Sequence, residues 1–162
     1  MKSFFTLAGL LIMLNAFPQD TKNTVGLRFG YTWGITYQAF VNEDKAFEGL
    51  LGFRNGGVQF YGLFQRYKPA FIEYTDHFYW YYGLGGHAGF VSWDDYDEYE
   101  PYHHHYVTHF GPVIGFDGNV GLEFWFYKIP VAIGLDYKPF IELFGPRFFN
   151  FMDCAFTIKY TF

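Results

Sequence analysis

Along most of this 162-residue chain, apolar residues occupy every second position. In the first such segment, the apolar positions are Val25, Leu27, Phe29, Tyr31 and Trp33. The same two-residue period continues in 80–90, 114–126, 131–138 and 155–162. Successive side chains of a β-strand point to opposite faces, so each segment is expected to be a strand with one apolar face and one small or polar face. The pattern predicts an all-β fold.

Eight strands account for the alternating segments, and turn residues separate them. The predicted strands are 24–33, 34–41, 46–54, 57–67, 78–93, 112–127, 130–144 and 150–162. Asn55-Gly56 is a strong hairpin signal, because both residues tolerate the positive φ angles that a two-residue turn requires. Longer links are expected at 68–77 and at 94–107. An even number of strands with short connections is typical of an up-and-down antiparallel sheet.

The aromatic content of the chain indicates whether the apolar faces of these strands point into the barrel or away from it. Phe, Tyr and Trp make up 26% of the chain, whereas charged residues make up only 17%. The interior of an eight-stranded barrel is only wide enough for ordinary side-chain packing, so these aromatic rings would overfill it. The crowding disappears if the aromatic faces contact lipid, while Gly, Thr, Asn and a few charges fill the interior. We therefore predict a closed antiparallel up-and-down transmembrane β-barrel of about eight strands, with a secreted soluble β-barrel or sandwich as the alternative.

Charge and cysteine content exclude several other classes of protein. The formal net charge of -5 argues against a strongly basic nucleic-acid-binding protein. The single cysteine, Cys154, excludes an intramolecular disulfide and a multi-cysteine metal site. No segment beyond the first twenty residues has 18 continuous apolar residues, so no transmembrane helix is predicted.

The first residues have the order of a secretory signal peptide. Lys2 supplies a positive charge, residues 4–14 form a largely apolar run, and Ala16 is a small residue at the expected cleavage point. Eleven residues are too few to span a bilayer as a helix, which takes about 20. We expect a signal peptide at 1–18, cleaved after residue 16 or 18, and a barrel domain at 19–162.

Three segments carry a resemblance to a known group of proteins: 25–30 (VGLRFG), 81–90 (YYGLGGHAGF) and 129–139 (IPVAIGLDYKP). On these, the chain resembles the small outer-membrane β-barrel proteins of Gram-negative bacteria, in particular a porin-like group from Bacteroidetes-type organisms. The resemblance implies location in the bacterial outer membrane, contact with its lipid, and insertion by the barrel-assembly machinery. The ending, with Tyr160 third-last and Phe162 last, is similar to the terminal signal that this machinery reads. Thr157 stands where many such signals have glycine.

Polar residues on the opposite face of the strands are expected to fill the barrel lumen. The predicted lumen network is Arg28, Glu48, His87, Asp117, Glu123, Asp136, Lys138 and Lys159. The same face carries Gln59, Gln65, Asn119, Glu142 and Asp153. Arg28 and Lys159 become neighbours once the barrel closes, and Glu123 and Asp136 are their expected counter-charges. Because side chains can fill an eight-stranded interior, the lumen is predicted to be closed.

The sequence offers few candidates for catalysis or metal binding. The link 94–107 contains the weak metal candidates Asp95, Asp97, His103, His104 and His105. Three consecutive histidines cannot all point one way from an extended strand, so a solvated, polar surface loop is the favoured interpretation. An extracellular partner, if the protein has one, is expected to bind at this loop. His87 is expected to form hydrogen bonds in the lumen rather than to catalyse a reaction. Ser92 and His109 are the one nucleophile–base candidate, and no third group marks a triad.

Together these features predict an outer-membrane barrel with a structural or surface-interaction role, no catalytic residues and no cofactor. Two alternatives remain open: a lipid-modifying outer-membrane enzyme, and a small pore or transport protein.

Overall fold

The computed structural model describes residues 22–96, 106–145 and 148–162. The predicted signal peptide and the metal candidates Asp97, His103, His104 and His105 lie outside these described residues. Within the described ranges, no helix is long and apolar enough to cross a membrane.

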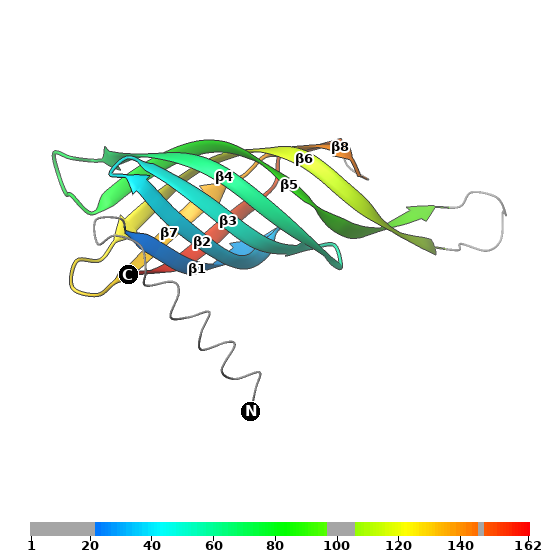
Figure 1. The fold of residues 1–162 in the computed structure, drawn as a ribbon, viewed down its shortest axis with the longest axis horizontal. Helices are drawn as coiled ribbons and strands as arrows, with labels where there is room; N and C mark the ends of the chain where they lie inside the picture. Colours follow the sequence, from blue (N-terminus) through cyan, green and yellow to red (C-terminus); the bar gives the residue numbers. More distant parts are fainter. Residues whose placement is uncertain (1–21, 97–105, 146–147) are drawn as a thin grey trace, which may run out of the picture.

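All the strands of the described residues belong to one antiparallel sheet that closes on itself (Figure 1). The strands are β1 (Asn23–Gly30), β2 (Trp33–Asn42), β3 (Lys45–Arg54), β4 (Gly57–Ala70), β5 (Phe78–Tyr96), β6 (Tyr106–Trp125), β7 (Val131–Tyr137), β8 (Phe140–Phe144), β9 (Phe149–Asn150) and β10 (Cys154–Thr161). The order runs from β5 back to β1, then through β10 and β7 to β6, and β6 pairs with β5 to close the ring.

Interruptions in two of the barrel strands explain why ten segments make an eight-stranded barrel. β7 and β8 both pair with β6, through Tyr137 opposite Val120 and Phe140 opposite Asp117, so together they form the seventh barrel strand. β9 and β10 pair with β8 and β7 and form the eighth. The backbone N–H of Lys138 donates to the carbonyl of Asp153 (2.8 Å), which joins the two interruptions. The prediction of a closed eight-stranded up-and-down barrel is confirmed.

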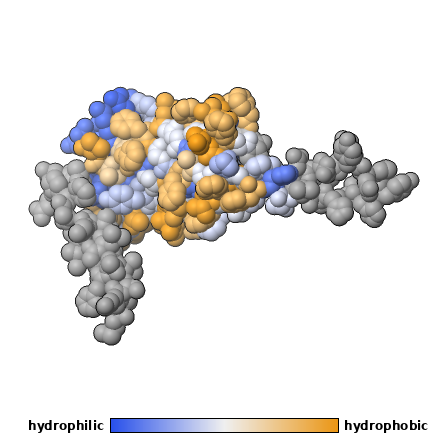
Figure 2. Space-filling view, turned by 45° about the vertical axis from the view of Figure 1, so that its right-hand side comes forward, coloured by the Kyte–Doolittle hydropathy of each residue, from blue (hydrophilic) through white to orange (hydrophobic). Residues whose placement is uncertain are grey.

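The faces of the barrel are inverted relative to those of a soluble protein. Large apolar side chains point outward, and several are more exposed than buried, such as Phe60 (67% exposed) and Leu84 (75%). Polar side chains point inward, and Gln38, Gln65 and Glu123 have no exposed surface. Figure 2 shows hydrophobic residues over the middle of one face, with hydrophilic residues at its left end and beside the grey segment on the right.

The two ends of the barrel are distinguished by their connections. Asn23 and Phe162 exchange backbone hydrogen bonds (3.0 and 2.9 Å), so the first and last strands meet at the end that also carries the turns at 43–44, 71–77 and 126–130. At the other end, the β3–β4 turn has Asn55 at φ 49° and Gly56 at φ 63°, as the hairpin signal predicts. We call these the terminal end and the hairpin end.

The links predicted at 68–77 and 94–107 are shorter in the structure. β4 continues to Ala70, and the β5–β6 pairing continues as far as Tyr96 opposite Tyr106. The prediction of a loop over all of 94–107 was therefore wrong at both of its ends. Cross-strand contacts extend the hairpin: the Trp93 ring stacks on His109 (5.8 Å), and the Thr108 hydroxyl donates to Asp94 (2.8 Å). As a result, β5 and β6 extend well beyond the other strands (Figure 1).

Candidate functional site

The interior of the barrel holds every residue of the predicted lumen network. Arg28, Glu48, His87, Asp117, Glu123, Asp136, Lys138 and Lys159 are all buried, with exposed fractions of 8% or less. Gln59, Gln65, Asn119, Glu142 and Asp153 are buried with them. The structure distributes the charged residues over three contact groups, which we call the Lys159, Arg28 and Arg54 clusters.

The Lys159 cluster lies toward the terminal end. Lys159 Nζ is 2.5 Å from Glu123 Oε1 and 3.9 Å from Glu48 Oε2. The Gln65 amide donates to Glu48 Oε2 (2.5 Å) and to Asn119 Oδ1 (2.8 Å). One ammonium group therefore bridges two carboxylates, and the Thr36 hydroxyl donates to the other oxygen of Glu48.

Aromatic rings pack against the Lys159 cluster on its terminal side. Tyr67 stacks on Tyr81 at 4.9 Å, and Phe40 contacts both Tyr67 (5.0 Å) and Trp125 (5.8 Å). Both the Tyr67 hydroxyl and the Trp125 indole N–H donate to the Glu123 carboxylate, each at 3.2 Å. These rings pack around the ion pair on its terminal side.

The aromatic content of the interior corrects one expectation. Gly, Thr, Asn and a few charges were expected to fill the lumen, yet Tyr61, Tyr67, Tyr81 and Phe140 are buried there. The sequence held the signal, because Tyr61 and Tyr67 share the parity of Gln59 and Gln65, and Tyr81 shares that of His87. Inward glycines make the room: a Cβ on Gly121 would lie 2.4 Å from the Tyr81 ring.

Gly26 makes room for Lys159 in the same way. The two residues lie opposite each other on β1 and β10, and a Cβ on Gly26 would lie only 2.7 Å from Lys159 Cγ and 2.6 Å from the Ile158 carbonyl oxygen. The lysine side chain therefore passes flat over the glycine on its way into the lumen. Alanine at position 26 would force the lysine stem and the β10 backbone at Ile158 to shift.

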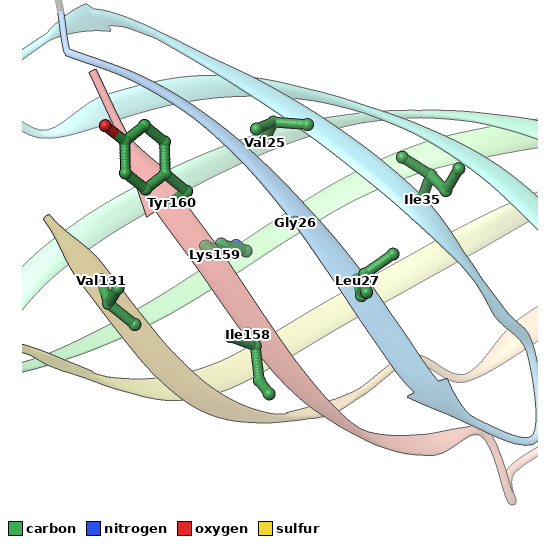
Figure 3. A pocket seen from close by; sticks show the side chains of 8 residues that line it. All are labelled: Val25, Gly26, Leu27, Ile35, Val131, Ile158, Lys159 and Tyr160. Atoms are coloured by element: carbon green, nitrogen blue, oxygen red, sulfur yellow. The ribbon is translucent and has the colours of Figure 1, made fainter.

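An apolar groove of about 270 Å³ lies on the outer side of the same part of the wall (Figure 3). The outward side chains that line it are Val25, Leu27, Ile35, Val131, Ile158 and Tyr160. It offers almost no polar surface, so it has nothing with which to orient a polar substrate.

The Arg28 cluster spans the middle of the lumen. Arg28 makes a two-point contact with Asp136, through Nη2 to Oδ1 (2.6 Å) and Nε to Oδ2 (3.2 Å). Its Nη1 reaches Asp153 Oδ1 (3.0 Å) and also donates to the Thr32 carbonyl. Planar guanidinium groups match carboxylates well in this paired geometry, which is among the stronger hydrogen-bonded arrangements in proteins.

A chain of contacts continues from Asp153 toward the hairpin end. Lys138 Nζ lies 3.0 Å from Asp153 Oδ2 and 3.3 Å from Asp117 Oδ1. His87 Nδ1 lies 2.8 Å from the second oxygen of Asp117. Thus His87 is held as a hydrogen-bonded member of the lumen network.

The Arg54 cluster was not anticipated. Arg54 Nη2 forms an ion pair with Glu142, and its guanidinium carbon lies 4.3 Å from the centre of the Phe140 ring. Arg54 has the same parity as Glu48 on β3, which would have placed it inside. Its position directly before the Asn55-Gly56 turn instead suggested the end of a strand.

The candidates for chemistry outside the lumen remain apart. Ser92 lies opposite Phe110, whereas His109 lies opposite Trp93, so the serine and histidine side chains point to opposite faces of the hairpin. Among the described residues, no group of three or more His, Cys, Asp or Glu residues could hold a metal ion. For the metal candidate Asp95, the structure describes the backbone pairing with Val107.

Comparison with solved structures shows the same architecture in another protein. The crystal structure of the N-terminal β-barrel domain of Pseudomonas aeruginosa OprF matches 88% of this chain and 96% of its own, with a TM-score of 0.57. Sequence identity is 9%, so the similarity shows the fold alone. No protein-family model matches the sequence, and no curated protein is significantly similar to it.

Proposed function

We propose that this chain is a bacterial outer-membrane β-barrel protein with a closed lumen and a structural or surface-interaction role. The observation that carries the proposal is the inversion of the two faces, with lipid-compatible side chains outside and paired charges inside. A closed barrel leaves no strand edge unpaired in hydrocarbon, and an apolar outer band is what a bilayer requires. The fold shared with the OprF barrel domain supports this location.

The closed lumen is supported by the density of paired charges in it. The described residues bury four cationic side chains, Arg28, Arg54, Lys138 and Lys159, and each contacts at least one carboxylate. Eight-stranded barrels are just wide enough to be filled by side chains, whereas aqueous channels occur in barrels of about 16–18 strands. An ion that crossed this lumen would have to separate pairs whose members are at least nine-tenths buried, so little water could rehydrate them.

The surface-interaction role rests on the β5–β6 hairpin. It extends beyond the other strands and presents Trp93, His109 and Asp94 near its end. The proposed partners are outer-membrane lipid at the apolar faces, the barrel-assembly machinery during insertion, and an extracellular partner at 94–107. The separation of Ser92 from His109 gives a lipid-modifying activity no support.

Cell fractionation tests the location. The mature protein is expected in the outer-membrane fraction, and it should migrate faster on gels before boiling than after it, because the hydrogen-bonded barrel resists detergent. Recovery in the soluble periplasmic fraction, with no heat-dependent change in mobility, would exclude the membrane barrel.

The orientation of the barrel gives a second expected result. With both termini in the periplasm, the hairpin end faces the medium. In a Cys154→Ala background, Asp94→Cys should react with a membrane-impermeant maleimide on whole cells, whereas Asp44→Cys should react only after the outer membrane is broken. The opposite labelling pattern would invert the orientation.

The last strand gives a third expected result. Removing Phe162 should reduce the amount of folded barrel in the outer membrane by several-fold while leaving export to the periplasm unchanged, since the resemblance assigns the assembly signal to the final residues. Phe148→Ala, which removes an exposed aromatic ring elsewhere, is the control and should assemble normally. If the truncated and full-length chains assemble equally well, then Phe162 is not part of the assembly signal.

A further inference from the structure

Two buried side chains at the hairpin end keep hydrogen-bond donors without partners. Arg54 uses Nη2 on Glu142, while its Nε and Nη1 have no hydrogen-bond partner among the residues that the structure describes. Gln59 accepts a hydrogen bond from the Tyr61 hydroxyl through Oε1, and its Nε2 has no partner within the described ranges. Arg54 is 3% exposed and Gln59 is 0% exposed. Buried donors are nearly always satisfied in proteins, so these nitrogen atoms call for an acceptor.

The strand register brings the two side chains to one part of the lumen wall. Arg54 on β3 lies opposite Gly57 on β4, and Gln59 is two residues beyond Gly57 on β4. The pair is therefore a diagonal neighbour pair on the inner face, within reach of long side chains.

The surroundings of this pair carry further nitrogen-bearing groups. The Phe140 ring is contacted by Arg54 (4.3 Å), by Lys138 (5.5 Å) and by the His87 ring (5.5 Å). Tyr61, which orients Gln59, lies 4.0 Å from Lys138 Nζ and 5.1 Å from the His87 ring. Arg54, Lys138 and His87 therefore all contact the Phe140 ring; Arg54 is paired with Glu142, and Lys138 and His87 share Asp117.

The unpartnered groups of Arg54 and Gln59 are donors only, and this constrains the ligand. Guanidinium and amide nitrogens cannot accept a hydrogen bond. A water molecule bound to them would need two acceptors for its own hydrogens, whereas a small anion offers acceptor sites alone. An anion also interacts with the Arg54 charge, and charge-assisted hydrogen bonds are the stronger kind.

We propose that Arg54 and Gln59 form a binding site for one small monovalent anion, a halide or a short carboxylate, in the hairpin half of the lumen. The anion accepts from Arg54 Nε or Nη1 and from Gln59 Nε2. This site does not depend on the proposed function. It requires only that the barrel folds as described, whether or not the barrel lies in the outer membrane or conducts ions.

Gln59→Glu provides a sharp test, because it builds the ligand into the protein. In this variant, the Tyr61 hydroxyl still donates to one side-chain oxygen of residue 59. The second carboxylate oxygen replaces the amide nitrogen, and its negative charge takes the role of the bound anion. In wild-type protein purified in detergent micelles, bromide or formate should raise the temperature at which half the barrel unfolds by about 5 °C at constant ionic strength. Gln59→Glu should lose this dependence and unfold at or above the wild-type temperature without added anion.

Gln65→Glu is the matched control, on the same strand and equally buried. The Gln65 amide donates to Glu48 and Asn119 oxygens, so a carboxylate there faces another carboxylate and should lower the unfolding temperature. Its anion-dependent rise should remain, because the Arg54 and Gln59 donors are intact.

Crystals of the wild-type protein soaked in bromide give a direct readout that does not depend on a variant. An anomalous scattering peak from bromide is expected within hydrogen-bond distance of Arg54 and Gln59. A second soak in formate shows whether a short carboxylate binds at the same position. Ordered water alone at this position, or the same anion-dependent rise in Gln59→Glu as in wild type, would overturn the site.

Discussion

Replacing Arg28 with methionine is expected to lower the free energy of unfolding by about 3–5 kcal/mol, the usual loss when one partner of a buried ion pair is removed. Methionine keeps much of the side-chain volume but leaves Asp136 without its two-point partner and deprives Asp153 of one of its two cations. Reversible urea unfolding of the barrel in phospholipid vesicles measures the effect.

Arg66→Met is the matched control for this variant. Arg66 is about half exposed, and its nearest carboxylate oxygen, on Asp44, is 4.0 Å away. Exposed pairs of this kind contribute at most about 1 kcal/mol, so the control should unfold nearly as wild type does. If Arg28→Met loses no more stability than Arg66→Met, then the Arg28 cluster does not stabilise the barrel.

Replacing Lys159 with methionine is expected to have a similarly large effect, again about 3–5 kcal/mol. The variant leaves Glu123 and Glu48 facing each other across the lumen without the ammonium group that separates them. Lys159 Nζ is 2.5 Å from the Glu123 carboxylate but 3.9 Å from that of Glu48, so the larger part of the loss should come from Glu123.

A second change separates this electrostatic effect from lost packing. In the double variant Lys159→Met, Glu123→Gln, the unpaired carboxylate is gone, and at least half of the lost stability should return. A double variant as unstable as Lys159→Met alone would assign the loss to the packing of the lysine stem against Gly26 and to the contact of its ammonium group with the Tyr81 ring.

The alternation of residue types was sufficient to predict the barrel and the inward position of the eight residues of the predicted lumen network, although not that of Arg54. A shift of one residue turns every side chain of a strand to the other face, so the positions of Arg28, Glu123 and Lys159 follow from parity once one face is assigned to lipid. The counter-charges expected for Arg28 and Lys159 were Glu123 and Asp136; the structure places Asp136 against Arg28 and Glu123 against Lys159.

The features that the residue pattern did not predict depend on contacts between strands. Tyr81 was not assigned to the interior, because the aromatic side chains as a class had been assigned to the outer face. Its ring fits inside because Gly121 lies directly opposite on β6, a fact of register rather than of composition. The strand interruptions at 138–139 and 151–153 were not predicted for the same reason. They are joined by a backbone hydrogen bond between Lys138 and Asp153, which lie on different barrel strands. The extension of β5 and β6 into the predicted loop likewise depends on pairing between Trp93 and His109 that neither strand shows alone.

The measurement that tests the central claim most directly is ion conductance of the purified barrel in planar lipid bilayers. A lumen closed by paired charges predicts no stable stepwise current from the wild-type protein, and Arg28→Met should lose stability without gaining a porin-sized current. Reproducible porin-sized steps from wild-type protein, abolished by heat denaturation, would contradict the closed lumen and favour the small pore.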